Sequence, residues 1–126
     1  MPSIVLVAIG GALGSVLRYL LVSSAHQLLS GWRFPIGTFL VNVLGCLAIG
    51  GFAALAQRGG FLSADMRLFL MTGLAGGFTT FSAFGLETFE LLRRAEWAIA
   101  GSYVLASLVV GMSALALGFA LLAQKT

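Results

Sequence analysis

The sequence predicts an all-α membrane protein with four transmembrane helices in a single domain spanning residues 1–126. Of its 126 residues, 60% are hydrophobic and only 9% are charged, whereas a soluble domain carries about 25% charged residues. The mean hydropathy is correspondingly high, at +1.06. Too few polar side chains are present to cover a water-facing surface, so we expect membrane lipid to surround the chain.

Four apolar segments are long enough to cross a bilayer. A spanning helix needs about 20 apolar residues, because each adds about 1.5 Å across a hydrocarbon layer about 30 Å thick. The segments that qualify are residues 4–24, 36–56, 68–92 and 97–123. Only Arg18 interrupts the first segment, and the third is uncharged as far as Leu86. Pro35 suits the start of the second helix, and Ser63 is expected to cap a helix that begins near Ala64.

The middle of the third segment differs from the other spans. Residues 73–85 contain four glycines and the pair Thr79-Thr80, which weaken a continuous helix. A broken helix is tolerated in a membrane only where it is buried in protein or lines a wet cavity. The alternative is that Gly73 and Gly77 form a close-packing face on an unbroken helix. The pattern favours a break at mid-membrane.

Positive charge is almost equally divided between the two ends of the predicted bundle. One side carries Arg58, Arg67 and Lys125, and the other carries Arg33, Arg93 and Arg94, with Arg18 added if its side chain extends toward the first loop. The positive-inside rule therefore gives little direction. Such a weak bias suits an antiparallel homodimer of two oppositely inserted copies, although one dominant loop could still fix a single orientation. The longest basic run is Arg93-Arg94, so we expect interfacial anchoring and no nucleic-acid partner.

Residues typical of catalysis or proton coupling are scarce. The first, second and fourth spans contain no Asp, Glu or Lys, which argues for a passive pore. Glu87 and Glu90 are interpreted as helix-end charges paired with the arginines that follow them. His26 is expected to be interfacial, and the single cysteine, Cys46, can form no disulfide within the chain. Since no nucleophile–base pair, metal-ligand cluster or phosphate loop is present, we predict no enzymatic activity.

Uncharged polar and aromatic side chains recur at helical spacing in the second, third and fourth segments. Those with a candidate role are Thr38, Asn42, Thr80, Phe81, Ser82, Phe84, Tyr103 and Ser107. Hydroxyl and amide hydrogens can replace the water around a small anion, and phenyl edges carry partial positive charge. A lining without a fixed cation lets the ion leave again. The alternatives are hydroxyls bonded to their own helices, Asn42 joining two helices, and phenyl rings facing lipid.

Arg18 lies deep enough in the first segment to affect a pore. Its charge could make a vestibule electropositive and attract anions. Equally, its long side chain could extend to the lipid headgroups. The sequence leaves both interpretations open.

Three motifs, in this order, resemble the Fluc (CrcB) family of small fluoride channels. They are Gly10 to Tyr19, Pro35 to Thr38 followed by Asn42 and Gly45, and Gly76 to Phe84. The resemblance extends over nearly the whole chain, and the third motif is the most specific. Two positions depart from the family pattern. Ala83 stands where threonine is usual, and Gly111 stands where the polar residues of the fourth helix commonly continue.

The resemblance implies a dual-topology homodimer that passively exports fluoride through two pores across the cell inner membrane. It implies pore roles for Phe81, Phe84 and Asn42, and a polar track through Thr38, Tyr103 and Ser107. A structural sodium ion would be held at the dimer interface by the backbone oxygens of Gly76 and Thr79. Two other functions remain as alternatives. A small dual-topology multidrug transporter would need a carboxylate in its first helix, and a non-transporting assembly subunit would show no flux alone.

Overall fold

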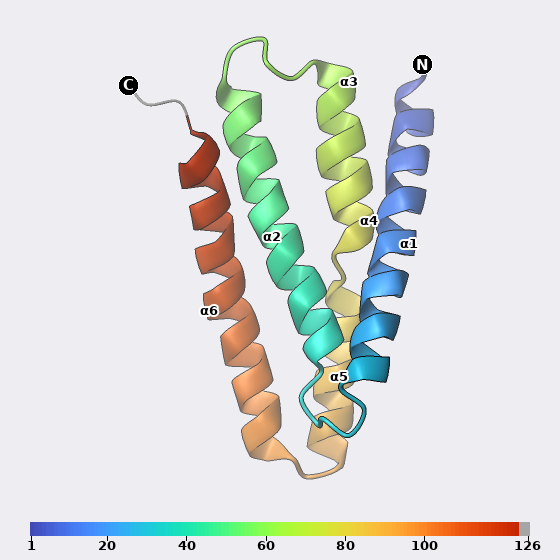
Figure 1. Cartoon of the computed structure of the whole chain (residues 1–126), viewed down its shortest axis with the longest axis vertical. Coiled ribbons are helices and arrows are strands. Elements are labelled where there is room, and N and C mark those ends of the chain that lie inside the picture. Colours follow the sequence, from blue (N-terminus) through green and yellow to red (C-terminus); the bar gives the residue numbers. More distant parts are fainter. Residues whose placement is uncertain (124–126) are drawn as a thin grey trace.

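The computed structural model describes residues 1–123 as a bundle of four spans (Figure 1). The first, second and fourth spans are single helices, α1 (Ser3–Leu28), α2 (Ile36–Gln57) and α6 (Trp97–Leu122). The third span consists of α3 (Ala64–Arg67), the π-helix η1 (Leu68–Ala75), α4 (Gly76–Phe78) and α5 (Phe81–Arg93). All four spans are long and apolar enough to cross a membrane, which confirms the predicted fold class. Lys125, counted in the charge comparison, lies outside the described residues.

The predicted start of the helix at the third span is confirmed, whereas the first helix is longer than predicted. The Ser63 hydroxyl accepts a hydrogen bond of 3.1 Å from the Met66 amide, so Ser63 caps the helix that begins at Ala64. Helix α1 continues four residues beyond the apolar segment and ends before Gly31, whose φ of +99° favours glycine. The turn after α5 instead places Ala95 in the left-handed region, at φ +58°.

The third span breaks at Thr79 and Thr80, and both residues are extended. The chain then starts α5 with its own cap, because the Thr80 hydroxyl accepts a 3.2 Å hydrogen bond from the Ala83 amide. In Figure 1 the break is the short stretch of thin ribbon between α4 and α5, near the middle of the bundle. The predicted interruption of the third span is therefore confirmed.

The glycine packing face also exists, beside the break rather than instead of it. Gly10 and Gly14 of α1 are buried against Gly73 and Gly77 of the third span. A Cβ atom on Gly73 would lie 3.0 Å from the Gly10 Cα atom, so the two backbones touch. Small residues allow this close approach where lipid provides no hydrophobic drive for association.

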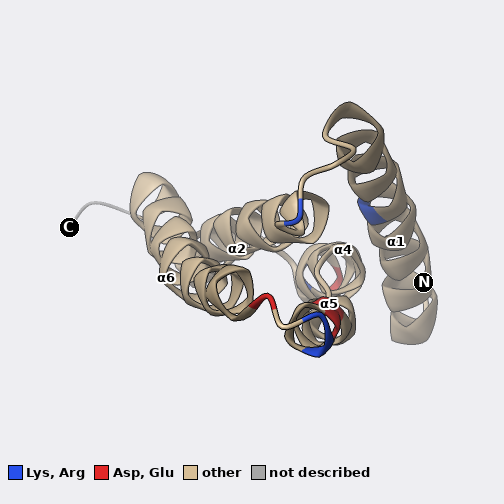
Figure 2. Ribbon diagram, turned by 90° about the horizontal axis from the view of Figure 1, so that it is seen from below, with Lys and Arg blue, Asp and Glu red and all other residues tan. Residues whose placement is uncertain are grey.

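Helix α2 packs on α6 in the same manner, and α5 packs on the first half of α6. Gly50 and Gly118 let the α2 and α6 backbones meet, while Leu91, Ala100 and Tyr103 form a buried cluster between α5 and α6. Viewed along the bundle, α1 and α6 lie on opposite sides, with α2 and the third span between them (Figure 2). This arrangement brings the break in the third span next to both α2 and α6.

Candidate functional site

A cavity of about 400 Å³ lies beside the break, between α2, the third span and α6. It collects most of the residues that the sequence singled out: Asn42, Gly76, Thr79, Thr80, Phe81, Phe84 and Ser107. Apolar residues and Cys46 complete its wall. No carboxylate or cationic side chain lines this cavity within the described part of the chain, so its polarity comes from hydroxyl, amide, thiol and backbone groups.

Asn42 binds the backbone of the third span at the break. Its side-chain amide nitrogen donates to the Thr80 carbonyl at 3.0 Å, and its carbonyl oxygen accepts from the Thr80 amide at 2.8 Å. This double contact satisfies backbone groups that the break removes from the helix ladder, which the membrane interior requires. The interpretation of Asn42 as a link between helices is thus supported, and one amide hydrogen remains for the cavity.

Hydroxyl groups near the break have different partners. The Thr79 hydroxyl donates to the Ala75 carbonyl at 3.0 Å, as expected for a threonine bonded to its own helix. The buried Thr80 hydroxyl lies 3.4 Å from that of Ser82, which is exposed and outside the cavity. Ser107 belongs to the cavity wall, and its hydroxyl is fully buried and has no partner among the described residues.

Aromatic rings connect the break to one end of the bundle. The Phe81 and Phe84 centroids are 5.8 Å apart, and Phe84 lies 5.1 Å from Tyr103. Tyr103 in turn meets Phe34 edge-on at 5.3 Å. Phe34 and Tyr103 come from distant parts of the sequence, and their contact joins the loop before α2 to α6 at this end. Phe81 is 84% exposed in the single chain, so it lies on the open side of the cavity.

Glu87 joins the polar side chains of the second and fourth spans. Its two carboxylate oxygens accept hydrogen bonds from the Thr38 hydroxyl at 2.6 Å and the Tyr103 hydroxyl at 3.0 Å. The sequence-based interpretation of Glu87 as a helix-end charge paired with an arginine is therefore wrong. It holds only for Glu90, which lies 3.3 Å from Arg93. Glu87 faces inward because it follows Thr80 and Phe84 at seven and three residues, on the same face of α5.

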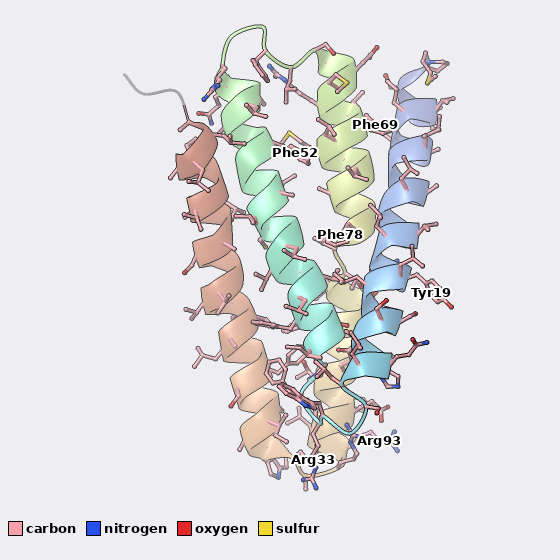
Figure 3. The ribbon with its side chains drawn as sticks, in the orientation of Figure 1. Tyr19, Arg33, Phe52, Phe69, Phe78 and Arg93 are labelled. Atoms are coloured by element: carbon pink, nitrogen blue, oxygen red, sulfur yellow. The ribbon has the colours of Figure 1, made fainter. Side chains whose placement is uncertain are left out.

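A second cavity, of about 480 Å³, opens at this end between α1, α5 and the loop that precedes α2. Thr38 and Glu87 belong to its wall, and His26, Arg33, Glu90 and Arg94 also line it. Figure 3 shows Arg33 and Arg93 at this same end of the bundle, where Figure 2 shows charged residues of both signs. We call this charged opening of the second cavity the charged mouth. The Thr38–Glu87–Tyr103 group thus lies between the charged mouth and the aromatic rings that lead to the break.

Three predicted site residues, Arg18, Ser82 and Tyr103, line neither cavity, although the Tyr103 hydroxyl reaches Glu87 in the wall of the second one. Arg18 is partly exposed on α1 and forms no ion pair within residues 1–123. Ser82 lies on the exposed side of α5. Conversely, sequence reasoning missed Glu87, although its spacing from Thr80 and Phe84 was a signal that it shares their helix face. Because Glu90 and Arg93 follow closely, Glu87 was instead interpreted as one of several charges at the helix end.

Comparison with known proteins assigns the chain to a family. Residues 5–119 match the family described as "CrcB-like protein, Camphor Resistance (CrcB)". A protein of Methylobacillus flagellatus named "Fluoride-specific ion channel FluC" is 53% identical over 96% of this chain and 94% of its own length. Proteins with the same name from Rhizobium etli and Paracoccus denitrificans are 49% and 51% identical, over 93% and 89% of this chain and 93% and 87% of their own lengths. This multi-pass membrane chain belongs to the CrcB-like family.

Proposed function

We propose that this protein is a fluoride channel of the cell inner membrane that lets the ion leave the cytoplasm passively. The main support is the cavity at the break, which offers hydroxyl, amide and phenyl groups to an anion without a fixed cation. Donors of this kind replace the hydration shell of a small anion, and the missing counter-charge allows release. The names of the relatives from M. flagellatus and R. etli support fluoride as that anion.

The proposed path runs from the break to the charged mouth. Fluoride would meet Phe81, Phe84 and the free Ser107 hydroxyl first, together with the remaining amide hydrogen of Asn42. It would then pass to the Tyr103 and Thr38 hydroxyls, whose single hydrogens are donated to Glu87 in this structure and would have to turn from the carboxylate to the ion. Each step exchanges one set of donors for another, so the ion is never left without a hydrogen-bond partner in the low-dielectric interior.

The working unit would be an antiparallel homodimer with two pores. The cavity is open on one side, and Phe81 is 84% exposed there. A second copy related by an axis in the membrane plane would cover that side and place its own break next to this one. The even distribution of positive charge between the two ends supports insertion in both orientations.

Backbone oxygens at the break fit a structural sodium ion. The Thr80 amide, which would normally bond the Gly76 carbonyl, donates to Asn42 instead. The Ala83 amide, which would normally bond the Thr79 carbonyl, donates to the Thr80 hydroxyl. Both carbonyls therefore lose their usual helical donors, and carbonyl oxygens are suitable ligands for a small monovalent cation. At a two-fold axis, the same oxygens of both copies would hold sodium and tie the two broken helices together.

The test is fluoride release from liposomes that contain the purified protein alone. Liposomes loaded with potassium fluoride should release fluoride to an electrode when valinomycin lets potassium follow, at equal pH inside and outside. Liposomes loaded with potassium chloride should release no chloride under the same conditions. Release that required a proton gradient would instead indicate coupled transport, for which Glu87 supplies the membrane-embedded carboxylate. The absence of release under both conditions would favour a non-transporting subunit.

A further inference from the structure

The wall of the cavity has a gap in its polar lining at Gly111. Ser107 and Gly111 are four residues apart on α6 and share a face, and both line the cavity at the break. Since Gly111 has no side chain, α6 offers no polar group one turn beyond Ser107. The side chain that fills this place comes from the neighbouring helix. A Cβ atom on Gly111 would lie 3.5 Å from the Cys46 sulfur of α2.

Cys46 itself belongs to the cavity wall and is only partly buried. A second observation points to a polar ligand on this side of the cavity. The buried Ser107 hydroxyl has no partner among the described residues, and an unpartnered buried hydroxyl costs about 1–3 kcal/mol unless water or a ligand satisfies it. Cys46 and Ser107 therefore lie on the same side of the cavity, where water or an anion would satisfy the Ser107 hydroxyl.

We infer that the Cys46 thiol is a further anion-contacting group of the pore and takes the place of the side chain that Gly111 lacks. This inference rests on the proposed function, because it assigns a residue to the same path. The S–H group is a weak donor, which suits a position where the ion is passed on rather than held. A bulky group on this sulfur would then close the path.

The only cysteine of the chain makes this testable with a thiol reagent. Methyl methanethiosulfonate forms a mixed disulfide with the Cys46 sulfur. The S–S bond of the reagent breaks, and methanesulfinic acid leaves with the thiol proton. Treated protein in liposomes should release fluoride only at the rate of protein-free liposomes, and dithiothreitol should restore the original rate. Complete modification, measured by intact mass, with an unchanged rate would overturn the inference.

Two variants separate a pore effect from general damage. Treated and untreated Cys46→Ser should release fluoride at the same rate, because the reactive sulfur is gone. Ser113→Cys in that background places a thiol on an exposed position of α6 outside the cavity. It should be modified without any change in rate. Inhibition of this control would show that the reagent acts by damaging the bundle, which would remove the support for Cys46.

A rescue experiment tests whether a hydroxyl at position 111 can replace the Cys46 thiol. Cys46→Ala should slow fluoride release about fivefold, as expected for one lost donor. Adding Gly111→Ser should recover most of that loss, since a side chain fits there at ordinary contact distance. Failure of this double variant to recover would contradict the inference.

If the unmodified protein releases no fluoride, the proposed function fails. Failure of the reagent to label Cys46 in the native wild-type protein, while it labels native Cys46→Ser/Ser113→Cys, would then contradict a cavity-exposed Cys46 independently.

Discussion

Individual side chains at this site act mostly by holding backbone and other side chains in position. Asn42 replaces the helix ladder at Thr80, and Glu87 accepts from the hydroxyls of two other spans. Tyr103 has no exposed surface, so its hydroxyl has little access to water in the single chain. These contacts mean that substitutions here change both stability and the path, and the two effects need separate measurements.

Tyr103→Phe should lower both stability and fluoride flux. The change removes one of the two donors to Glu87 and leaves a carboxylate oxygen unpaired inside the bundle, at a cost of about 1–3 kcal/mol. Thermal unfolding in detergent measures the first effect, and liposome release measures the second. Ser102→Ala is the control, because it removes an exposed hydroxyl that bonds its own helix at Ala98. Equal effects from the two substitutions would contradict the assigned role of Tyr103.

Ala95→Gly should stabilise the protein. Ala95 occupies the left-handed region at φ +58°, where a Cβ atom costs about 1–2 kcal/mol that glycine avoids. A higher midpoint of thermal unfolding is therefore expected, with unchanged fluoride release. Ala98→Gly, a substitution of the same type within α6, should have the opposite effect of about 1 kcal/mol. A lower midpoint for Ala95→Gly would show that the turn does not carry this strain.

At the scale of elements, the sequence was sufficient for the four spans and for the break. Long apolar segments and a cluster of glycines and threonines are local patterns, and both were interpreted correctly. The two interpretations of the glycines proved compatible, because Gly73 and Gly77 precede the break and pack on α1. What could not be predicted was the pairing between distant side chains. The contact of Glu87 with Thr38 spans 49 residues, and no local pattern specifies it.

Gly14→Leu should separate α1 from the third span. A side chain at Gly14 would meet the Leu74 carbonyl and the Phe78 amide, which are backbone groups that cannot rotate away. We expect a loss of about 1–3 kcal/mol from overpacking, seen as earlier thermal unfolding and faster proteolysis in detergent. Gly101→Leu on α6 adds the same side chain where nothing lies within 4 Å. That control should remain folded, and a stable Gly14→Leu protein would contradict the close packing.

For the whole molecule, the proposed dimer requires chains inserted in both orientations. In a Cys46→Ser background, Gly59→Cys places a single thiol at one end of the bundle, and Trp32→Cys places one at the other end. Both positions are exposed. A membrane-impermeant maleimide applied to intact cells should label about half of each protein if insertion is dual. Labelling of one position alone would establish a single orientation and would exclude the antiparallel assembly.

The central claim is that phenyl rings and hydroxyls at the broken third span, rather than a fixed charge, carry fluoride across the membrane. The most direct test is the initial rate of fluoride release from liposomes containing wild type, Phe81→Ile or Phe89→Ile. Phe89 is also an exposed phenyl group of α5 but lies outside the cavity. We predict that Phe81→Ile greatly reduces release while remaining folded, and that Phe89→Ile conducts like wild type. Release by Phe81→Ile at the wild-type rate would contradict this claim.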